Sequence, residues 1–187
     1  MGQPSDSLTV AYLALGSNLG DRPGYLRGAA AAFRDHPQII VSAVSPVYES
    51  PAHTISSNES QPPFLNAVLE IQTSLDPIEL LELCQGIERR AGRERTADRW
   101  APRTLDLDVL IFGKTTLRRD GLTIPHPRIA ERAFVLRPLA DIAPDLLVPP
   151  PYSASVRHLL EACPDLGETV RTEFSLLDAG KKVRSRP

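Results

Sequence analysis

An α+β fold with an antiparallel sheet is predicted for this chain of 187 residues, and three observations predict it. Strand-like and helix-like apolar patterns follow one another as strand, helix, strand, strand, helix, strand. Both helical patterns begin at residues that favour helix N-termini, and polar turns with glycine or proline separate the segments. The apolar fraction of 42% suffices for one substantial core, so we expect a single domain over residues 8–164.

The first half of the chain contains three of the expected strands. Residues 8–15 (LTVAYLAL) form an apolar strand, which the glycines of GSNLGD are expected to end. An alanine-rich helix follows over about 21–36, with Asp21 as its N-cap. A second strand is expected over 38–48, and a third over 64–73, where apolar and polar residues alternate.

The second half begins with a helix whose start is marked by a capping box. Asp76 and Glu79 have the spacing of that motif, Pro77 takes the first helical position, and Gly92 ends the helix. A strand over 105–112 then completes a ferredoxin-like βαββαβ order, with the helices packed on one face of the sheet.

The C-terminal additions are expected to be smaller elements. They comprise a hairpin within TTLRRDGLTIP, a short helical stretch around 128–140 and a helix near 153–162. Residues 1–7 are expected to be disordered, and the polar tail 165–187 receives no assignment from its pattern.

The composition indicates which partners and which cellular compartment to expect. The 21 basic and 23 acidic residues nearly balance, so no general affinity for nucleic acid is expected. Cys84 and Cys163 lack metal-site spacing, which favours a reduced cytoplasmic protein. No apolar run approaches the roughly 20 residues that span a bilayer, and the N-terminus lacks a signal-peptide pattern, so no membrane contact is expected.

Asp106 and Asp108 occupy alternate positions of the last expected strand, within RWAPRTLDLDVLIFG (99–113). Strand side chains alternate between two faces, so both carboxylates should share one face, with Cα atoms about 6.5–7 Å apart. Two such carboxylates repel each other unless a cation lies between them, and Mg²⁺ prefers carboxylate oxygens that it shares with phosphates. The alternative is a solvated edge strand. The opposite face should carry Leu105, Leu107, Val109 and Ile111.

Six arginines precede this strand within fifteen residues: Arg89, Arg90, Arg93, Arg95, Arg99 and Arg103. Guanidinium groups next to a carboxylate pair favour a polyphosphate site, although a solvated helix end would also explain the first two arginines. His126, between two prolines in IPHPRIAERAF, could donate to phosphate or be incidental. No P-loop spacing is present.

Four segments, in this order and spacing, resemble the 6-hydroxymethyl-7,8-dihydropterin pyrophosphokinases of folate biosynthesis. They are ALGSNLGD (14–21), FLN (64–66), RWAPRTLDLDVLIFG (99–113) and IPHPRIAERAFVL (124–136). The resemblance implies a stand-alone, monomeric, cytoplasmic enzyme that transfers the β,γ-pyrophosphate of ATP to the pterin and releases AMP. It also implies two Mg²⁺ ions held by Asp106 and Asp108.

The resemblance further assigns roles residue by residue. Arg93 and Arg103 would be catalytic, with Arg93 on a loop that closes over ATP and Trp100 sealing it. The ATP side would comprise Gln85, Glu88, Arg95, Trp100, Arg103, Val109, Thr123, His126 and Arg132. The pterin side would comprise Ser50, Pro51, Phe64, Asn66, Trp100 and Phe134, and the alternative for both phenylalanines is plain core packing.

Two rival functions stay open on the residues alone. A ferredoxin-like module could use its arginine loop to bind RNA or another polyanion, although carboxylates on the strand do not suit that role. A nucleotidyltransferase could use the same pair of aspartates and would release pyrophosphate instead of AMP. Loop 51–62 departs from the family pattern, with SQP at 60–62 where an acidic DQP is often found.

Overall fold

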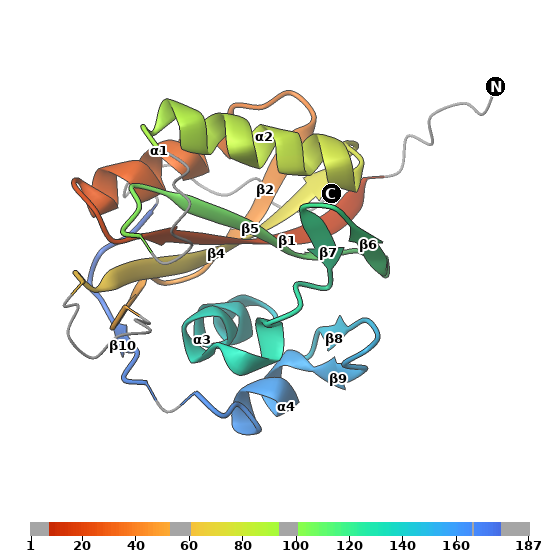
Figure 1. Cartoon of the computed structure of the whole chain (residues 1–187). Helices are drawn as coiled ribbons and strands as arrows, with labels where there is room; N and C mark the ends of the chain where they lie inside the picture. Colours follow the sequence, from red (N-terminus) through yellow and green to blue (C-terminus); the bar gives the residue numbers. More distant parts are fainter. Residues whose placement is uncertain (1–7, 53–60, 94–100, 166, 177–187) are drawn as a thin grey trace.

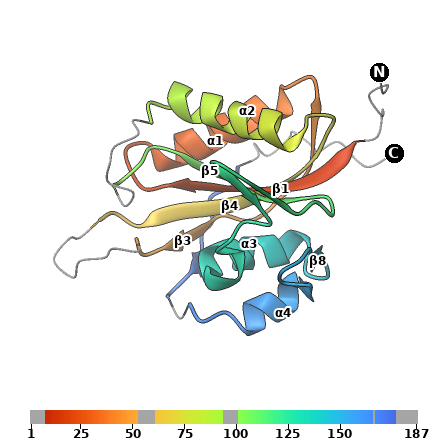
Figure 2. The ribbon, with the colours of Figure 1, turned by 45° about the vertical axis from the view of Figure 1, so that its right-hand side comes forward.

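A twisted antiparallel sheet lies between two pairs of helices in the computed structural model, which describes residues 8–52, 61–93, 101–165 and 167–176. Figure 1 and Figure 2 show α1 (Arg22–Arg34) and α2 (Pro77–Arg90) covering one face of the sheet, and α3 (Ala133–Ile142) and α4 (Val156–Glu161) on the other. The predicted α+β class, with its first two helices on one face, is confirmed.

The sheet has six strands within the described residues, and each strand pair is antiparallel. Its order is β10-β3-β4-β1-β5, and β2 also pairs with β4. The strands β4 and β1 are therefore central, and β5, which carries Asp106 and Asp108, lies at one end of this order. The bounds are β1 Thr9–Ser17, β2 Ile39–Val44, β3 Tyr48–Ser50, β4 Phe64–Thr73, β5 Asp106–Phe112 and β10 Val170–Arg171.

The expectation that glycine ends the first strand is wrong, because β1 continues through Gly16 to Ser17. Gly16 pairs with Asn66 of β4 on one side and with Asp106 of β5 on the other, so both ladders continue through it. The missing side chain thus leaves space on the sheet surface without interrupting the strand.

The single strand expected over 38–48 is also wrong, because the chain forms β2 and β3 with a break at 45–47. The Ser45 N–H donates to the Val68 carbonyl at 2.9 Å, but the Val68 N–H donates to the Ser45 hydroxyl oxygen at 2.8 Å. A side chain thus replaces the main-chain acceptor, and Pro46 cannot donate to a ladder. Both strands still pair with β4.

The two main helices begin where their capping residues predict. Asp21 accepts from the Gly24 N–H at 3.0 Å. Asp76 accepts from the Ile78 and Glu79 N–H groups, and the Glu79 carboxylate accepts from the Asp76 N–H, so the capping box is complete. These bonds satisfy donors that the first helical turn leaves without partners.

Strand β5 differs in one detail from simple alternation. Leu13 pairs with Val109 whereas its neighbour Tyr12 pairs with Ile111, so Leu110 is an extra residue in the ladder. As a result Ile111 joins the apolar cluster beneath α3, and the expectation that it faces the same side as Leu107 is wrong.

The C-terminal additions follow β5. The predicted hairpin is confirmed as β6 (Leu117–Arg119) and β7 (Leu122–Ile124), and a 3₁₀ turn (Ile129–Glu131) leads into α3. A small hairpin of β8 (Leu147–Val148) and β9 (Ala154–Ser155) was not predicted. Within the segment that its sequence left unassigned, β10 pairs with β3.

Two apolar clusters hold the layers together, one between the sheet and α1/α2, the other between the sheet and α3/α4. Phe33 and Leu80 are fully buried in the first, and Leu136 and Leu139 in the second. Within the described ranges, no helix combines the length and apolarity needed to cross a membrane.

Candidate functional site

The largest set of predicted site residues meets in one pocket between the sheet and the start of α3. Three cross-strand neighbours form its floor, because Asp106 pairs with Gly16 and Gly16 pairs with Asn66. A residue with no side chain therefore separates the carboxylate from the amide, which leaves a hollow. The lining consists of Ala14, Leu15, Gly16, Ser50, Pro51, Gln61, Phe64, Asn66, Ala67, Arg103, Asp106, Asp108, Arg128, Arg132, Phe134 and Val135.

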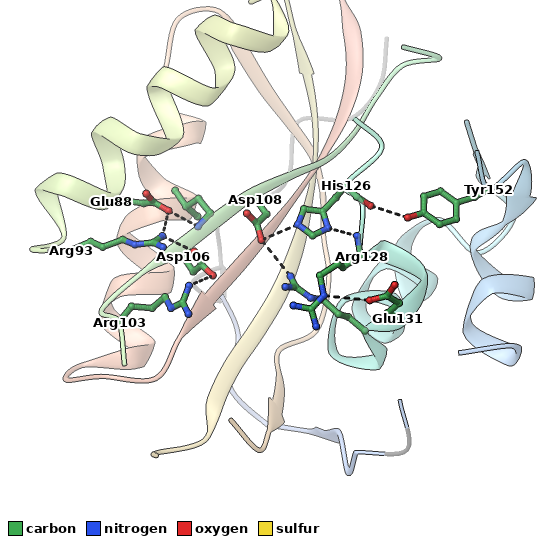
Figure 3. A network of polar contacts seen from close by, with 11 residues as sticks. Glu88, Arg93, Arg103, Asp106, Asp108, His126, Arg128, Glu131 and Tyr152 are labelled. Carbon is green, nitrogen blue, oxygen red and sulfur yellow. Dashed lines mark hydrogen bonds and ion pairs between the residues drawn. The ribbon is translucent and has the colours of Figure 1, made fainter. Parts of the chain in front are cut away.

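Asp106 and Asp108 both line this pocket, as strand alternation predicts. Their side chains are 27% and 37% exposed, so both remain accessible to a ligand. Figure 3 shows that each carboxylate faces its own group of basic side chains, Asp106 the arginines on the α2 side of β5 and Asp108 the group near α3 that includes His126.

Asp106 is paired with two arginines. Arg93 Nη1 lies 2.5 Å from one carboxylate oxygen, and Arg103 Nη1 lies 3.1 Å from the other. Arg93 also pairs with Glu88, whose carboxylate accepts from the Leu107 N–H at 2.9 Å. Desolvation lowers the pKa of Arg93, but the nearby carboxylates of Asp106 and Glu88 raise it by more. The pKa of Arg93 is therefore raised overall.

The end of α2 explains why Arg93 lies beside the strand. Gly92 has a positive φ of 75°, its N–H donates to the Arg89 carbonyl, and the Arg93 N–H donates to the Glu88 carbonyl. These bonds form a Schellman motif, which reverses the chain after the helix. The glycine predicted as the helix end thus also sets the position of a predicted catalytic arginine.

Asp108 has looser partners. His126 Nε2 and Arg132 Nη1 each lie 3.7 Å from its carboxylate. Desolvation raises the pKa of Asp108 to about 6, repulsion from Asp106 adds to the rise, and Arg132 opposes it. Desolvation also lowers the pKa of Arg132. A further positive charge at this carboxylate would therefore be favoured.

The opposite part of the pocket is more apolar and contains the residues expected to bind the pterin. The Asn66 amide donates to the Ser50 hydroxyl at 3.0 Å, and its side chain borders the space above Gly16. Phe64 and Phe134 line the pocket from β4 and α3, respectively, so neither is confined to the core. Each ring also has an arginine nearby, namely Arg103 at 6.0 Å from the Phe64 centroid and Arg132 at 5.6 Å from the Phe134 centroid.

Asn18 is an important residue that the sequence did not single out. It is fully buried, and its side-chain oxygen accepts from the Arg103 N–H at 2.8 Å. Its own N–H donates to the Arg103 carbonyl at 3.2 Å, and the neighbouring Ser17 hydroxyl donates to the Thr104 carbonyl. The GSNLG segment therefore holds Arg103 in place. The only sequence signal for Asn18 was that it belongs to the ALGSNLGD segment.

The lining residues that were not predicted are Ala14, Leu15, Gly16, Gln61, Ala67, Arg128 and Val135. Gly16 was treated as a strand breaker, and Arg128, which lines the pocket near His126, was overlooked although it belongs to the PHPR segment. The Arg128 N–H donates to His126 Nδ1 at 3.2 Å, and the Tyr152 hydroxyl donates to the Pro127 carbonyl at 2.7 Å. The turn that holds His126 is thus fixed from two sides.

Other residues predicted for the ATP side lie outside this pocket. Glu88 is 3% exposed, Gln85 lies on the same helix α2, and Thr123 lies on β7. Val109 is 3% exposed in the α1/α2 cluster, so only its main chain could contact a nucleotide. Arg95 and Trp100 lie outside the described residues.

Comparison with known proteins shows which family the sequence matches. Residues 12–144 match the family model of 7,8-dihydro-6-hydroxymethylpterin-pyrophosphokinase. A 2-amino-4-hydroxy-6-hydroxymethyldihydropteridine pyrophosphokinase of Bacillus subtilis is 50% identical over 133 residues, which is 71% of this chain and 77% of the relative. The Pseudomonas aeruginosa protein of the same name is 44% identical over 153 residues, covering 82% and 91%.

Solved structures show the same fold at low sequence identity. A Plasmodium falciparum HPPK-DHPS structure has a TM-score of 0.67 at 14% identity, over 86% of this chain and 44% of that chain. This chain therefore spans less than half the length of that protein.

Proposed function

Because the chain belongs to the family of 7,8-dihydro-6-hydroxymethylpterin pyrophosphokinases, we propose that the pocket between β5 and α3 is its active site. The chain transfers the pyrophosphoryl group of ATP to 6-hydroxymethyl-7,8-dihydropterin in folate biosynthesis. The observation that carries the proposal is the meeting of a carboxylate pair, arginines and two aromatic rings in one hollow.

The apolar part of the pocket suits the pterin. Phe64 and Phe134 offer rings for stacking, and aromatic contacts of this kind add to simple area burial. Asn66, oriented by the Ser50 hydroxyl, presents an amide to the polar edge of a heterocycle. The hollow above Gly16 lies between this amide and Asp106, so the hydroxymethyl group would point toward the carboxylates.

The two carboxylates suit Mg²⁺. Among the residues that the structure describes, no group of three or more His, Cys, Asp or Glu side chains could hold a metal. Mg²⁺ is commonly held by one or two carboxylates together with substrate phosphates, so a pair is sufficient. We propose that Asp106 and Asp108 hold two Mg²⁺ ions, which would neutralise charge on the transferred phosphates.

The basic side chains around the pair would position the triphosphate. Arg93 and Arg103 approach Asp106 from one side of β5, whereas His126 and Arg132 approach Asp108 from the other. Phosphate oxygens placed between these groups would meet guanidinium donors from both directions. The residues thus contribute positioning and charge stabilisation, which dominate phosphoryl transfer. No residue is assigned as a general base.

A product assay with a matched pair of variants tests this assignment. Asp108→Asn should lower AMP and pterin pyrophosphate formation by about a hundredfold or more, because it weakens the stabilisation of developing charge. Asp145→Asn is the control, since Asp145 is an exposed carboxylate paired with Arg157. Wild-type rates for Asp108→Asn at low magnesium would contradict the proposal.

We further propose a monomer that acts in the cytoplasm and binds no nucleic acid. The arginines that the structure describes near β5 are paired with carboxylates in a pocket and are not spread over an exposed sheet, which supports a small anionic substrate. Light scattering during size-exclusion chromatography tests whether the protein is a monomer. An RNA retention assay tests whether it binds nucleic acid.

A further inference from the structure

The chain segment after α4 contacts α3 and β3, two elements that contribute residues to the pocket, although it lies beyond the matched range 12–144. We propose that Asp165 in this segment is a positioning residue for the pterin side of the site. It acts through the first turn of α3. Phe134 in this turn and Arg132 just before it both line the pocket. This inference rests on the active site proposed above.

The N-terminus of α3 depends on a residue distant in sequence. Arg132, the residue at its N-cap position, makes no side-chain capping bond. Instead the Ala133 N–H donates to the Asp165 carboxylate at 2.9 Å, across 32 positions of the chain. A carboxylate here satisfies a donor that the first turn leaves open and complements the positive end of the helix dipole.

Asp165 is itself held in place. Its other carboxylate oxygen accepts from the Gly167 N–H at 2.9 Å. Farther along, β10 pairs with β3, and the Thr172 N–H donates to the Val47 carbonyl at 2.8 Å. Figure 1 shows this stretch running from α4 to the outer edge of the sheet. The segment therefore links α3 to β3, whose last residue, Ser50, lines the pocket with Phe134.

Loss of the cap should act locally. The body of α3 is anchored by Leu136 and Leu139, which are fully buried, so the helix should remain in place. The residues beside the cap, Arg132 and Phe134, are half-buried and would lose the fixed first turn that orients them. Pterin binding should suffer more than overall folding.

The experiment compares two variants, each of which loses the capping bond of one helix, α3 or α4, on the same face of the sheet. Asp165→Ala removes the cap of α3, and Ser155→Ala removes that of α4, where the Ser155 oxygen accepts from the His158 N–H at 3.2 Å. Thermal melting and calorimetric pterin binding, with a non-hydrolysable ATP analogue present, are measured for both. We expect roughly fivefold weaker pterin binding for Asp165→Ala, which is the change in equilibrium constant that corresponds to the stability lost with a typical N-cap. For Ser155→Ala we expect less than twofold weaker pterin binding. Asp165→Asn keeps one of the two acceptor oxygens and should restore part of the affinity.

A third variant, Phe134→Ala, separates failure of this inference from failure of the proposed site. If Phe134→Ala weakens pterin binding and Asp165→Ala does not, the positioning role is wrong and the site stands. Equal weakening by Asp165→Ala and Ser155→Ala would also overturn the role, since general destabilisation would explain it. If Phe134→Ala leaves pterin binding unchanged, the proposed pterin side fails and the inference fails with it.

Discussion

Arg93 lies 2.5 Å from the Asp106 carboxylate, so one of the two carboxylates proposed to hold magnesium is paired with an arginine in this structure. Glu88 holds the same guanidinium from the side of α2. A metal ion that binds Asp106 must therefore compete with Arg93, and the released guanidinium would then be available to phosphate.

Removing that competitor should separate metal binding from turnover. Arg93→Gln is expected to bind Mn²⁺ about tenfold more tightly without nucleotide, because a charge-assisted bond to Asp106 is lost. Its turnover should nevertheless fall. Arg89→Gln, which changes an exposed arginine on the same helix end, is the control. Electron paramagnetic resonance titration reports free Mn²⁺, and unchanged affinity in Arg93→Gln would refute the competition.

The two aspartates should differ in their effect on the stability of the metal-free protein. The pKa of Asp108 is raised to about 6 in the folded state, above the ordinary value of about 3.9. The folded protein therefore holds this proton more strongly, so the group's stabilising contribution is complete below about pH 4 and is lost as pH rises through 6. Asp108→Asn should raise the melting temperature at pH 8, and the gain should shrink toward pH 5.

Asp106→Asn should have the opposite effect, because it removes the ion pairs with Arg93 and Arg103. We expect a lower melting temperature at pH 8 in the presence of a chelator. Differential scanning calorimetry of both variants at pH 5 and 8 checks the pair of predictions. A gain for Asp108→Asn that is equal at the two pH values would rule out the titration argument.

Substitution of Asn18 should reduce turnover without changing a residue that lines the pocket. Asn18→Ala leaves the partly buried Arg103 N–H without its 2.8 Å acceptor, which should cost about 1 kcal/mol of folding free energy. Because Arg103 then loses one of its two bonds to residue 18, kcat should fall more than pterin affinity. Urea unfolding and steady-state kinetics measure the two effects, and an unchanged kcat would show that the anchor is not needed.

Enlarging Gly16 should block the pterin with little harm to the fold. A Cβ atom at this position would meet Asn66 Oδ1 and a Phe64 ring carbon at 3.6 Å, which is ordinary contact. Gly16→Ala should therefore fold normally, whereas the larger side chain of Gly16→Val should fill the hollow and abolish measurable pterin binding. Calorimetric titration checks this, and wild-type affinity in Gly16→Val would contradict the placement of the pterin.

Local signals account for the parts of the fold that were predicted well. The strand Phe64–Thr73 matches its predicted range, and the helix that begins at Pro77 was marked by a complete capping box. The break at Ser45 was missed because it depends on a bond to Val68, 23 positions away. The two-residue strands β8 and β9 are too short for a periodic pattern to appear.

The candidate site also contains residues that local sequence patterns predicted and residues that they did not. Alternation along β5 was sufficient to bring Asp106 and Asp108 to one pocket, but the pterin side depended on resemblance to a family. Asn18 and Asp165 act through partners 85 and 32 positions away, which no local pattern reveals. Closure of the loop around Trp100 stays a prediction, because residues 94–100 lie outside the described ranges.

The most direct test of the account counts the metal ions bound between the carboxylates and the nucleotide. Mn²⁺ is titrated into the protein with a non-hydrolysable ATP analogue and pterin, and bound ions are counted by electron paramagnetic resonance. The account predicts two tightly bound ions in the wild-type protein and at most one in Asp106→Asn or Asp108→Asn. Two ions bound with wild-type affinity in both variants would contradict it.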